Sequence, residues 1–146
     1  MRWYETRLRL EAKLDARVRL LQTIPGVGAV TASALAASVG DGRQFRNGRE
    51  FAAWLGLTPA NKSSGGKERL GRITKMGDQY LRQLLVVGAT SLVRQVRSHP
   101  ERANKWLTAL LERKPARLAT VAMANKTARI VWAVLTKNKP YTPRTT

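Results

Sequence analysis

The stretch from Lys62 to Lys75 has the residue types best suited to chemistry on a phosphodiester. It reads Lys-Ser-Ser-Gly-Gly-Lys-Glu-Arg-Leu-Gly-Arg-Ile-Thr-Lys, which sets two serines among glycines and cations. A serine hydroxyl there could attack a phosphodiester, because the cations would stabilise both the alkoxide and the transition state. The glycines permit close approach to a ligand, and we predict nucleic-acid contacts at Lys62, Gly65, Gly66, Lys67, Arg69, Arg72 and Lys75. On residue types alone, a basic loop that only holds nucleic acid is the simpler interpretation.

A second pattern, Ile24-Pro25-Gly26-Val27-Gly28, comes directly before a small apolar helix. This order is typical of helix-hairpin-helix DNA-binding proteins. The glycines let backbone N–H groups approach a phosphate, and the following helix offers the positive end of its dipole. We therefore predict that Gly26, Val27 and Gly28 bind nucleic acid through its backbone rather than its bases. A tight turn between two packed helices is the alternative.

The C-terminal third of the sequence is strongly basic. From Arg102 to Arg144 it holds ten Lys or Arg and one acid, Glu112, a net charge of +9. With so little acid to offset it, this charge favours a polyanion-binding face over an ordinary solvated surface.

Other candidate residues favour structure over chemistry. His99 precedes a proline and is predicted to be a helix cap or a surface residue. The four tryptophans stand among aliphatic residues at helical spacing and are predicted to be core. The acids, such as Asp41, Glu50, Glu68 and Asp78, are scattered, so we expect no metal site and no cofactor in this chain alone.

The elements that would carry these motifs are all predicted to be helices. Residues 1–22 form an amphipathic helix whose apolar residues recur about every 3.5 positions, which would suit a coiled coil. No capping residue precedes this helix, so we expect the helix to continue from an upstream part of the protein. Further helices are expected at about 29–39, in a short segment that Asn47 and Glu50 begin and Gly56 ends, at about 78–97, around Trp106, and at about 115–136.

The fold is thus predicted to be all-α. It is a small helical domain with a helix-hairpin-helix-like element, a long Gly/Ser/basic loop and an N-terminal coiled-coil-like helix. The expected parts are a linker helix at 1–22, the main domain at 23–136 and a frayed basic tail at 137–146.

Composition narrows the choice of partner. The 146 residues include 27 Lys or Arg and 9 Asp or Glu, so the net charge is +18. Such an excess needs a polyanion to screen it, with nucleic acid as the leading partner and an anionic membrane surface as the rival. There is no apolar run of about 18 residues that could span a bilayer. Cysteine is absent, which fits a cytoplasmic chain.

The motifs, taken in order, resemble the C-terminal domain of transposases of the insertion-sequence family numbered one hundred and ten. The resemblance runs from about Leu21 to His99, and the family's basic C-terminal helices would extend it to Tyr141. The residues that carry it are Thr23-Ile24-Pro25-Gly26-Val27-Gly28, Phe45, Phe51-Ala52-Ala53-Trp54-Leu55-Gly56-Leu57-Thr58-Pro59, Ser63-Ser64-Gly65-Gly66-Lys67, Leu70-Gly71-Arg72-Ile73-Thr74-Lys75, Gly77 and Tyr80-Leu81-Arg82. The family often has a basic residue soon after the proline that corresponds to Pro59, whereas this sequence has Ala60 and Asn61 at those positions.

The resemblance implies a DNA transposase or recombinase from a bacterial mobile element. Family members join an N-terminal RuvC-like domain, whose Asp-Glu-Asp-Asp site holds magnesium, to this domain through a coiled coil. A serine of this domain is the proposed nucleophile, which places it at Ser63, with Ser64 as the alternative. The implied partners are double-stranded DNA, a structured guide RNA and further copies of the full-length protein, with Arg82 among the nucleic-acid contacts. Without the acidic domain, this cytoplasmic, nucleoid-associated chain is expected to bind DNA but not to recombine it. A non-catalytic helix-hairpin-helix binding module is the alternative.

Overall fold

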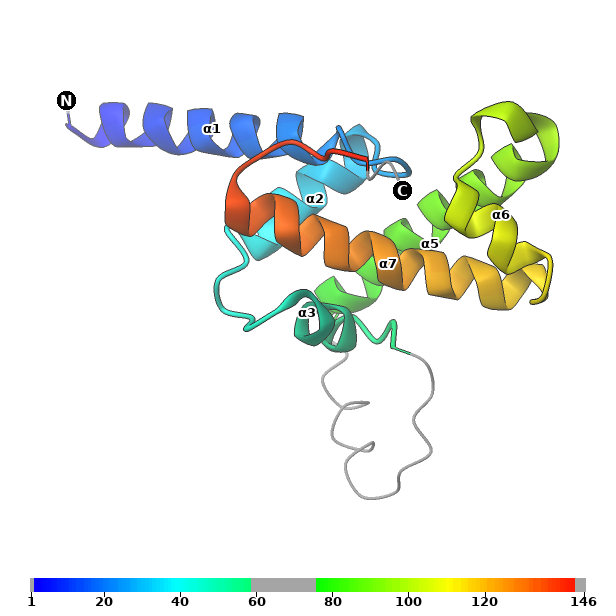
Figure 1. Cartoon of the computed structure of the whole chain (residues 1–146). Helices are drawn as coiled ribbons and strands as arrows, with labels where there is room; N and C mark the ends of the chain where they lie inside the picture. The colour runs from blue at the N-terminus through cyan, green and yellow to red at the C-terminus, as the bar shows by residue number, and fades with distance from the viewer. Residues whose placement is uncertain (1, 59–75, 144–146) are drawn as a thin grey trace, which may run out of the picture.

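The computed structural model describes residues 2–58 and 76–143, and every regular element in those two ranges is a helix. Figure 1 shows their arrangement. In chain order they are α1 (Arg2–Leu21), α2 (Ala29–Val39), α3 (Gly48–Trp54), α5 (Met76–Ser98), a 3-10 turn (Pro100–Arg102), α6 (Lys105–Leu111) and α7 (Ala116–Lys137). The predicted all-α class is therefore confirmed.

Helix α7 is the centre of the fold, and α5, α3, α1 and α6 all pack against it. It buries a broad face made of small and large side chains: Ala119, Met123, Ala124, Thr127, Ala128, Val131, Val134 and Leu135. The alanines allow neighbouring helices to approach, while the larger residues fill the space between them. Helix α5 supplies the opposing stripe with Leu81, Leu85, Ala89, Leu92 and Val93. Of the stripe predicted for α5, Leu84 and Gly88 are half-buried and the three other leucines are buried.

Helix α1 enters this core only with its last turn, where Leu21 is buried and Val18 is half-buried. The rest of α1 extends away from the body of the molecule (Figure 1). Its apolar residues face water, with 70% of Trp3 and 61% of Leu10 exposed. The predicted helix is present, and the coiled coil that its pattern suggests stays a prediction.

Helix α3 begins and ends with the caps that the sequence predicts. The Asn47 side chain accepts a hydrogen bond of 2.8 Å from the Glu50 N–H. The Glu50 carboxylate turns to the backbone N–H and the guanidinium of Arg46, and these bonds lower the pKa of Glu50. At the other end Gly56, at φ +77°, closes a Schellman motif in which Gly56 N–H bonds Ala53 and Leu57 N–H bonds Ala52.

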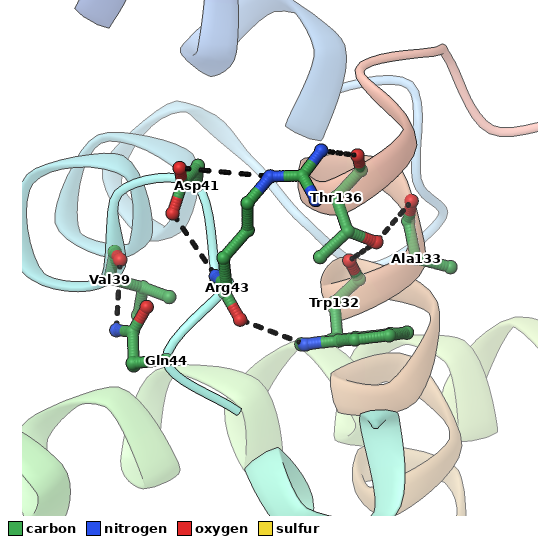
Figure 2. Close-up of polar contacts among 8 residues, drawn as sticks. Val39, Asp41, Arg43, Gln44, Trp132, Ala133 and Thr136 are labelled. Atoms are coloured by element: carbon green, nitrogen blue, oxygen red, sulfur yellow. Dashed lines mark hydrogen bonds and ion pairs between the residues drawn. The ribbon is translucent and has the colours of Figure 1, made fainter. Parts of the chain in front are cut away.

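The connection between α2 and α3 is held to α7 by long-range polar contacts (Figure 2). The Trp132 indole N–H donates a 3.0 Å hydrogen bond to the Gly42 carbonyl. Arg43 donates through Nη2 to the Thr136 carbonyl, also at 3.0 Å, and its Nε lies 3.9 Å from Asp41. These bonds fix a loop that contains two glycines with positive φ, Gly40 and Gly42.

The segment after α7 differs from the frayed tail expected from residue 137 onward. Asn138 ends α7 in the left-handed conformation, at φ 56°. The Tyr141 N–H then donates a 2.8 Å hydrogen bond to the Thr23 hydroxyl, and the Tyr141 side chain packs against the core. Because these contacts come from the other end of the chain, local sequence does not reveal them.

The prediction that the four tryptophans are core is wrong for Trp3 and Trp106, whereas Trp54 and Trp132 pack against the core. Trp3 and Trp106 are exposed, while Trp54 and Trp132 are half-buried. Each half-buried indole lies at the edge of the core, Trp54 beside Phe45 and Phe51 and Trp132 over Gly42. His99 is exposed and follows α5 directly, which confirms a surface position.

Candidate nucleic-acid interface

The connection between α1 and α2, residues 22–28, is called the hairpin below. One side of it packs against the body of the molecule and the other side is open to solvent. Gly26, at φ +88°, packs on α5, where an added Cβ would lie 3.0 Å from Leu92 Cδ1. The Gly26 carbonyl oxygen lies against Gly88 of α5, and any side chain larger than hydrogen at Gly88 would collide with it. Val27 is buried, so Gly28 is the exposed member of the predicted Gly26-Val27-Gly28 site.

Gly28 is also where the hairpin becomes α2. It is the N-cap, it has no side chain to cap the helix, and an added Cβ would meet nothing within 4 Å. The first N–H groups of a helix have no acceptor within the helix, and they carry the positive end of its dipole. The open face of the hairpin therefore offers unencumbered N–H donors, which is the chemistry that a phosphate requires.

Next to this helix end lies a shallow apolar depression. Tyr80 of α5 lines it together with Ala29, Val30, Ser33 and Ala34 of α2. Val30 and Tyr80 are among the most exposed large apolar side chains of the body of the molecule. An exposed valine and an exposed tyrosine therefore lie beside Gly28.

The predicted serine segment falls outside the described residues. This applies to both nucleophile candidates and to seven predicted contacts: Ser63, Ser64, Lys62, Gly65, Gly66, Lys67, Arg69, Arg72 and Lys75. The structure describes the chain before it, up to Thr58, and the helix that follows it, α5.

Arg82, a predicted nucleic-acid contact, points to the backbone before the serine segment. Its Nη1 donates a 3.3 Å hydrogen bond to the Leu55 carbonyl at the end of α3. Asn125 of α7, which sequence reasoning did not single out, donates through Nδ2 to the Leu57 carbonyl at 3.1 Å. No sequence signal distinguishes Asn125, because its partner lies 68 positions away. Gly88 was expected only as part of the apolar stripe of its helix, whereas in the structure it also lies against the Gly26 carbonyl.

The basic C-terminal segment presents most of its charge to solvent. The exposed cations are Arg102, Lys105, Arg113, Lys114, Arg117, Arg129, Lys137 and Lys139. Trp106 is 41% exposed, and the Lys126 Nζ lies 4.5 Å from the centre of its ring. Cations beside an exposed aromatic ring suit a nucleic-acid backbone and its bases.

Two absences apply to the described part of the chain. Residues 2–58 and 76–143 contain no cluster of three His, Asp or Glu that could hold a metal ion. No helix in the same ranges is long and apolar enough to cross a membrane.

Comparison with known proteins identifies the family. The profile described as "Transposase IS116/IS110/IS902 family" matches residues 18–106. A "Probable family 20 transposase" of Pseudomonas aeruginosa is 49% identical over 139 residues, which cover 95% of this chain and 41% of that protein. The transposase for insertion sequence element IS1111A of Coxiella burnetii is 45% identical over 138 residues, covering 94% and 38%. A pilin gene-inverting protein of Moraxella bovis is 28% identical over 134 residues, covering 90% and 41%.

The chain therefore belongs to the IS116/IS110/IS902 transposase family. It spans about two fifths of the length of these curated relatives. The matched range begins at Val18, where α1 reaches the core, and includes the hairpin and the serine pair.

Proposed function

We propose that the chain is the DNA-binding part of a DNA transposase and supplies the serine nucleophile for strand cleavage and exchange. The family match over residues 18–106 carries the proposal, because that range contains both the hairpin and Ser63-Ser64. The open N-terminus of α2 at Gly28 supports a phosphate contact through a helix-hairpin-helix-like element.

The proposed chemistry is transfer of a phosphodiester to serine. The Ser63 Oγ attacks the phosphorus as its proton passes to a base, and a deoxyribose oxygen leaves with the bonding electron pair. The hydroxyl of another DNA strand later attacks the phosphorus of the phosphoserine and releases the serine. This step joins the two strands through a new phosphodiester. Neighbouring cations would stabilise the charge that gathers on the phosphoryl oxygens. Magnesium, where the reaction uses it, would be held by acidic residues of another domain.

In the complete protein, a structured guide RNA and further copies of the protein would be the partners. We assign nucleic-acid binding to the exposed cations of α6 and α7. This chain by itself would bind DNA without recombining it. A cytoplasmic, nucleoid-associated location follows from a DNA substrate. The alternative function is a non-catalytic hairpin module, which would need the Gly28 surface but not the serines.

Ser63→Ala tests the proposal in the transposase expressed from its complete reading frame. The substrate is a plasmid that carries the insertion sequence and its flanks. We expect loss of strand cleavage and of the covalent protein–DNA adduct on a denaturing gel, with DNA affinity changed less than about threefold. The reason is that the variant removes the nucleophile but only one hydroxyl among many cationic contacts.

Ser64→Ala is the matched control and should cleave normally. An inactive Ser64→Ala beside an active Ser63→Ala would move the nucleophile to Ser64. Full cleavage by both single variants and by the double variant would contradict the serine mechanism and favour the binding module.

A further inference from the structure

Two arginines from different helices line one open pocket on the surface of the molecule. Arg49 belongs to α3 and Arg129 to α7, and Asn47 and Gly48 complete the lining. The pocket has a volume of about 400 Å³, and none of the described residues that line it is acidic. It shares none of them with the hairpin or with the depression beside Gly28. The pocket is therefore a separate place where positive charge is concentrated.

A close contact between the two helices brings the arginines together. Gly48 packs on α7, where an added Cβ would lie 3.2 Å from the Arg129 Cα and 3.3 Å from its carbonyl oxygen. The absence of a side chain at Gly48 thus lets α3 lie directly on the backbone of α7. Because Arg49 is the next residue after Gly48, the same contact fixes its backbone beside Arg129. The fold therefore pairs two residues that are distant in the sequence.

Neither guanidinium is neutralised within the part of the chain that the structure describes. No ion pair or hydrogen bond there involves the side chain of Arg49 or Arg129, and both residues are exposed. The carboxylate of Glu50, the residue after Arg49, lies 3.2 Å from the Nε of Arg46 instead. Arginine stays charged at every physiological pH. Two permanent cations in one pocket repel each other, and an anion between them would relieve that repulsion.

The surface beside the pocket indicates which anion fits it. Lys126 precedes Arg129 by three positions on α7, and this spacing puts two side chains on the same face of a helix. The Lys126 Nζ lies 4.5 Å from the centre of the Trp106 ring, and Trp106 is 41% exposed. A small free anion would use only the two arginines, whereas a nucleic-acid strand could also contact the neighbouring cation and ring. A chain of phosphates therefore suits this surface better than a single small anion.

We propose that Arg49 and Arg129 together bind one phosphate of the DNA backbone, at a contact point separate from the hairpin. The inference rests on the proposed function, because it names a site where the DNA-binding part of the transposase holds its substrate. Guanidinium groups suit this ligand, since their planar N–H donors match the oxygens of a phosphate. Such a contact positions the backbone and reads no bases, so it holds duplexes of any sequence.

Arg49→Gln and Arg129→Gln, singly and together, test the proposal in the complete transposase. The probe is a fluorescein-labelled DNA duplex that covers one end of the insertion sequence, titrated by anisotropy at several salt concentrations. Each single variant should bind about three- to tenfold more weakly, and its melting temperature should stay unchanged because both side chains are exposed. In the double variant, the plot of log K against log salt concentration should become shallower by about 0.9, the change expected for one phosphate.

Arg46→Gln is the matched control. It removes the same charge three positions before Arg49, but Arg46 is paired with Glu50 and does not line the pocket. Its affinity for the duplex should stay within about twofold of wild type. An equal loss in Arg46→Gln would show that only net charge matters and would overturn the proposal. Wild-type affinity in the double variant would overturn it as well.

Additivity tests whether the two arginines share one phosphate. If they do, the loss in the double variant is smaller than the product of the two single losses, because each arginine supports the contact of the other. A full product, with a slope change of about 1.8, would place the arginines on separate phosphates and contradict the shared pocket.

A second probe and the wild-type protein separate the remaining outcomes. Weaker binding of a duplex RNA by the variants, with unchanged binding of the DNA duplex, would overturn DNA as the occupant. If the wild type and the double variant bind the DNA duplex equally, the pocket fails and the proposed function stands. If the wild type does not bind the DNA duplex, the pocket and the proposed function fail together.

Discussion

Helices α1 and α7 are almost equal in length, at 20 and 22 residues, but they meet the rest of the molecule very differently. Helix α7 buries eight residues, whereas α1 buries only Leu21. The buried face of α7 is broad because it contacts four other helices. The apolar residues of α1 recur at a spacing that predicts a coiled coil, and the body of the molecule covers only the last turn of α1.

This difference teaches that amphipathic pattern and contribution to stability are separate properties. Both helices have an apolar stripe, but only buried apolar area contributes to folding. The stability of this chain should therefore come from α7 and its neighbours, while most of α1 adds little until something covers it.

Leu135→Ala should have the largest effect, because Leu135 is only 5% exposed on α7. We expect the free energy of unfolding to fall by about 2–5 kcal/mol, through lost burial and the cavity left behind. Urea unfolding followed by circular dichroism measures it. A loss below about 0.5 kcal/mol would mean that α7 is not the centre of the core.

Gly26→Ala should have an intermediate effect, at the hairpin where α1 meets the body. The positive φ and the contact with Leu92 should together cost about 1–3 kcal/mol of stability. Gly28→Ala is the matched control, because its Cβ meets nothing within 4 Å.

Gly28→Ala should leave the melting temperature nearly unchanged. It should weaken binding to duplex DNA in a fluorescence-anisotropy titration, because the methyl group obstructs the N–H groups of α2. Unchanged affinity in a folded Gly28→Ala protein would show that the hairpin is only a turn.

Leu10→Ala should have the smallest effect, because this α1 residue is already 61% exposed. The free energy of unfolding of the isolated chain should change by no more than about 0.5 kcal/mol. A loss comparable to that of Leu135→Ala would mean that α1 is covered in solution. Dilution would then lower the melting temperature if a second copy provides the cover.

Much of the fold could be predicted because its signals are local. The caps Asn47 and Gly56 mark α3, the apolar run that ends at Gly40 marks α2, and apolar stripes mark α5 and α7. Burial was harder to predict, because an indole at helical spacing looks the same whether its helix is covered or not. Trp3 shows this most clearly.

The candidate site could be predicted only in part. The residues of the hairpin are adjacent in sequence, so its glycines stand out together. The contacts of Asn125 and Gly88 each join a helix to a connecting segment distant in the sequence, so the residues next to them do not reveal these contacts. The same reason explains why the pattern could not show that Gly26 faces α5 while Gly28 faces solvent.

The hydrogen bond between Tyr141 and Thr23 also has a consequence for the order of synthesis. The two residues are 118 positions apart, and the hairpin is made long before its partner. At about 5–20 residues per second, a ribosome needs roughly 6–24 s to add the intervening chain. During that time the Thr23 hydroxyl lacks the Tyr141 N–H as a donor. The hairpin therefore gains this one contact only at the end of translation, and a chain that stops short of Tyr141 would lack it.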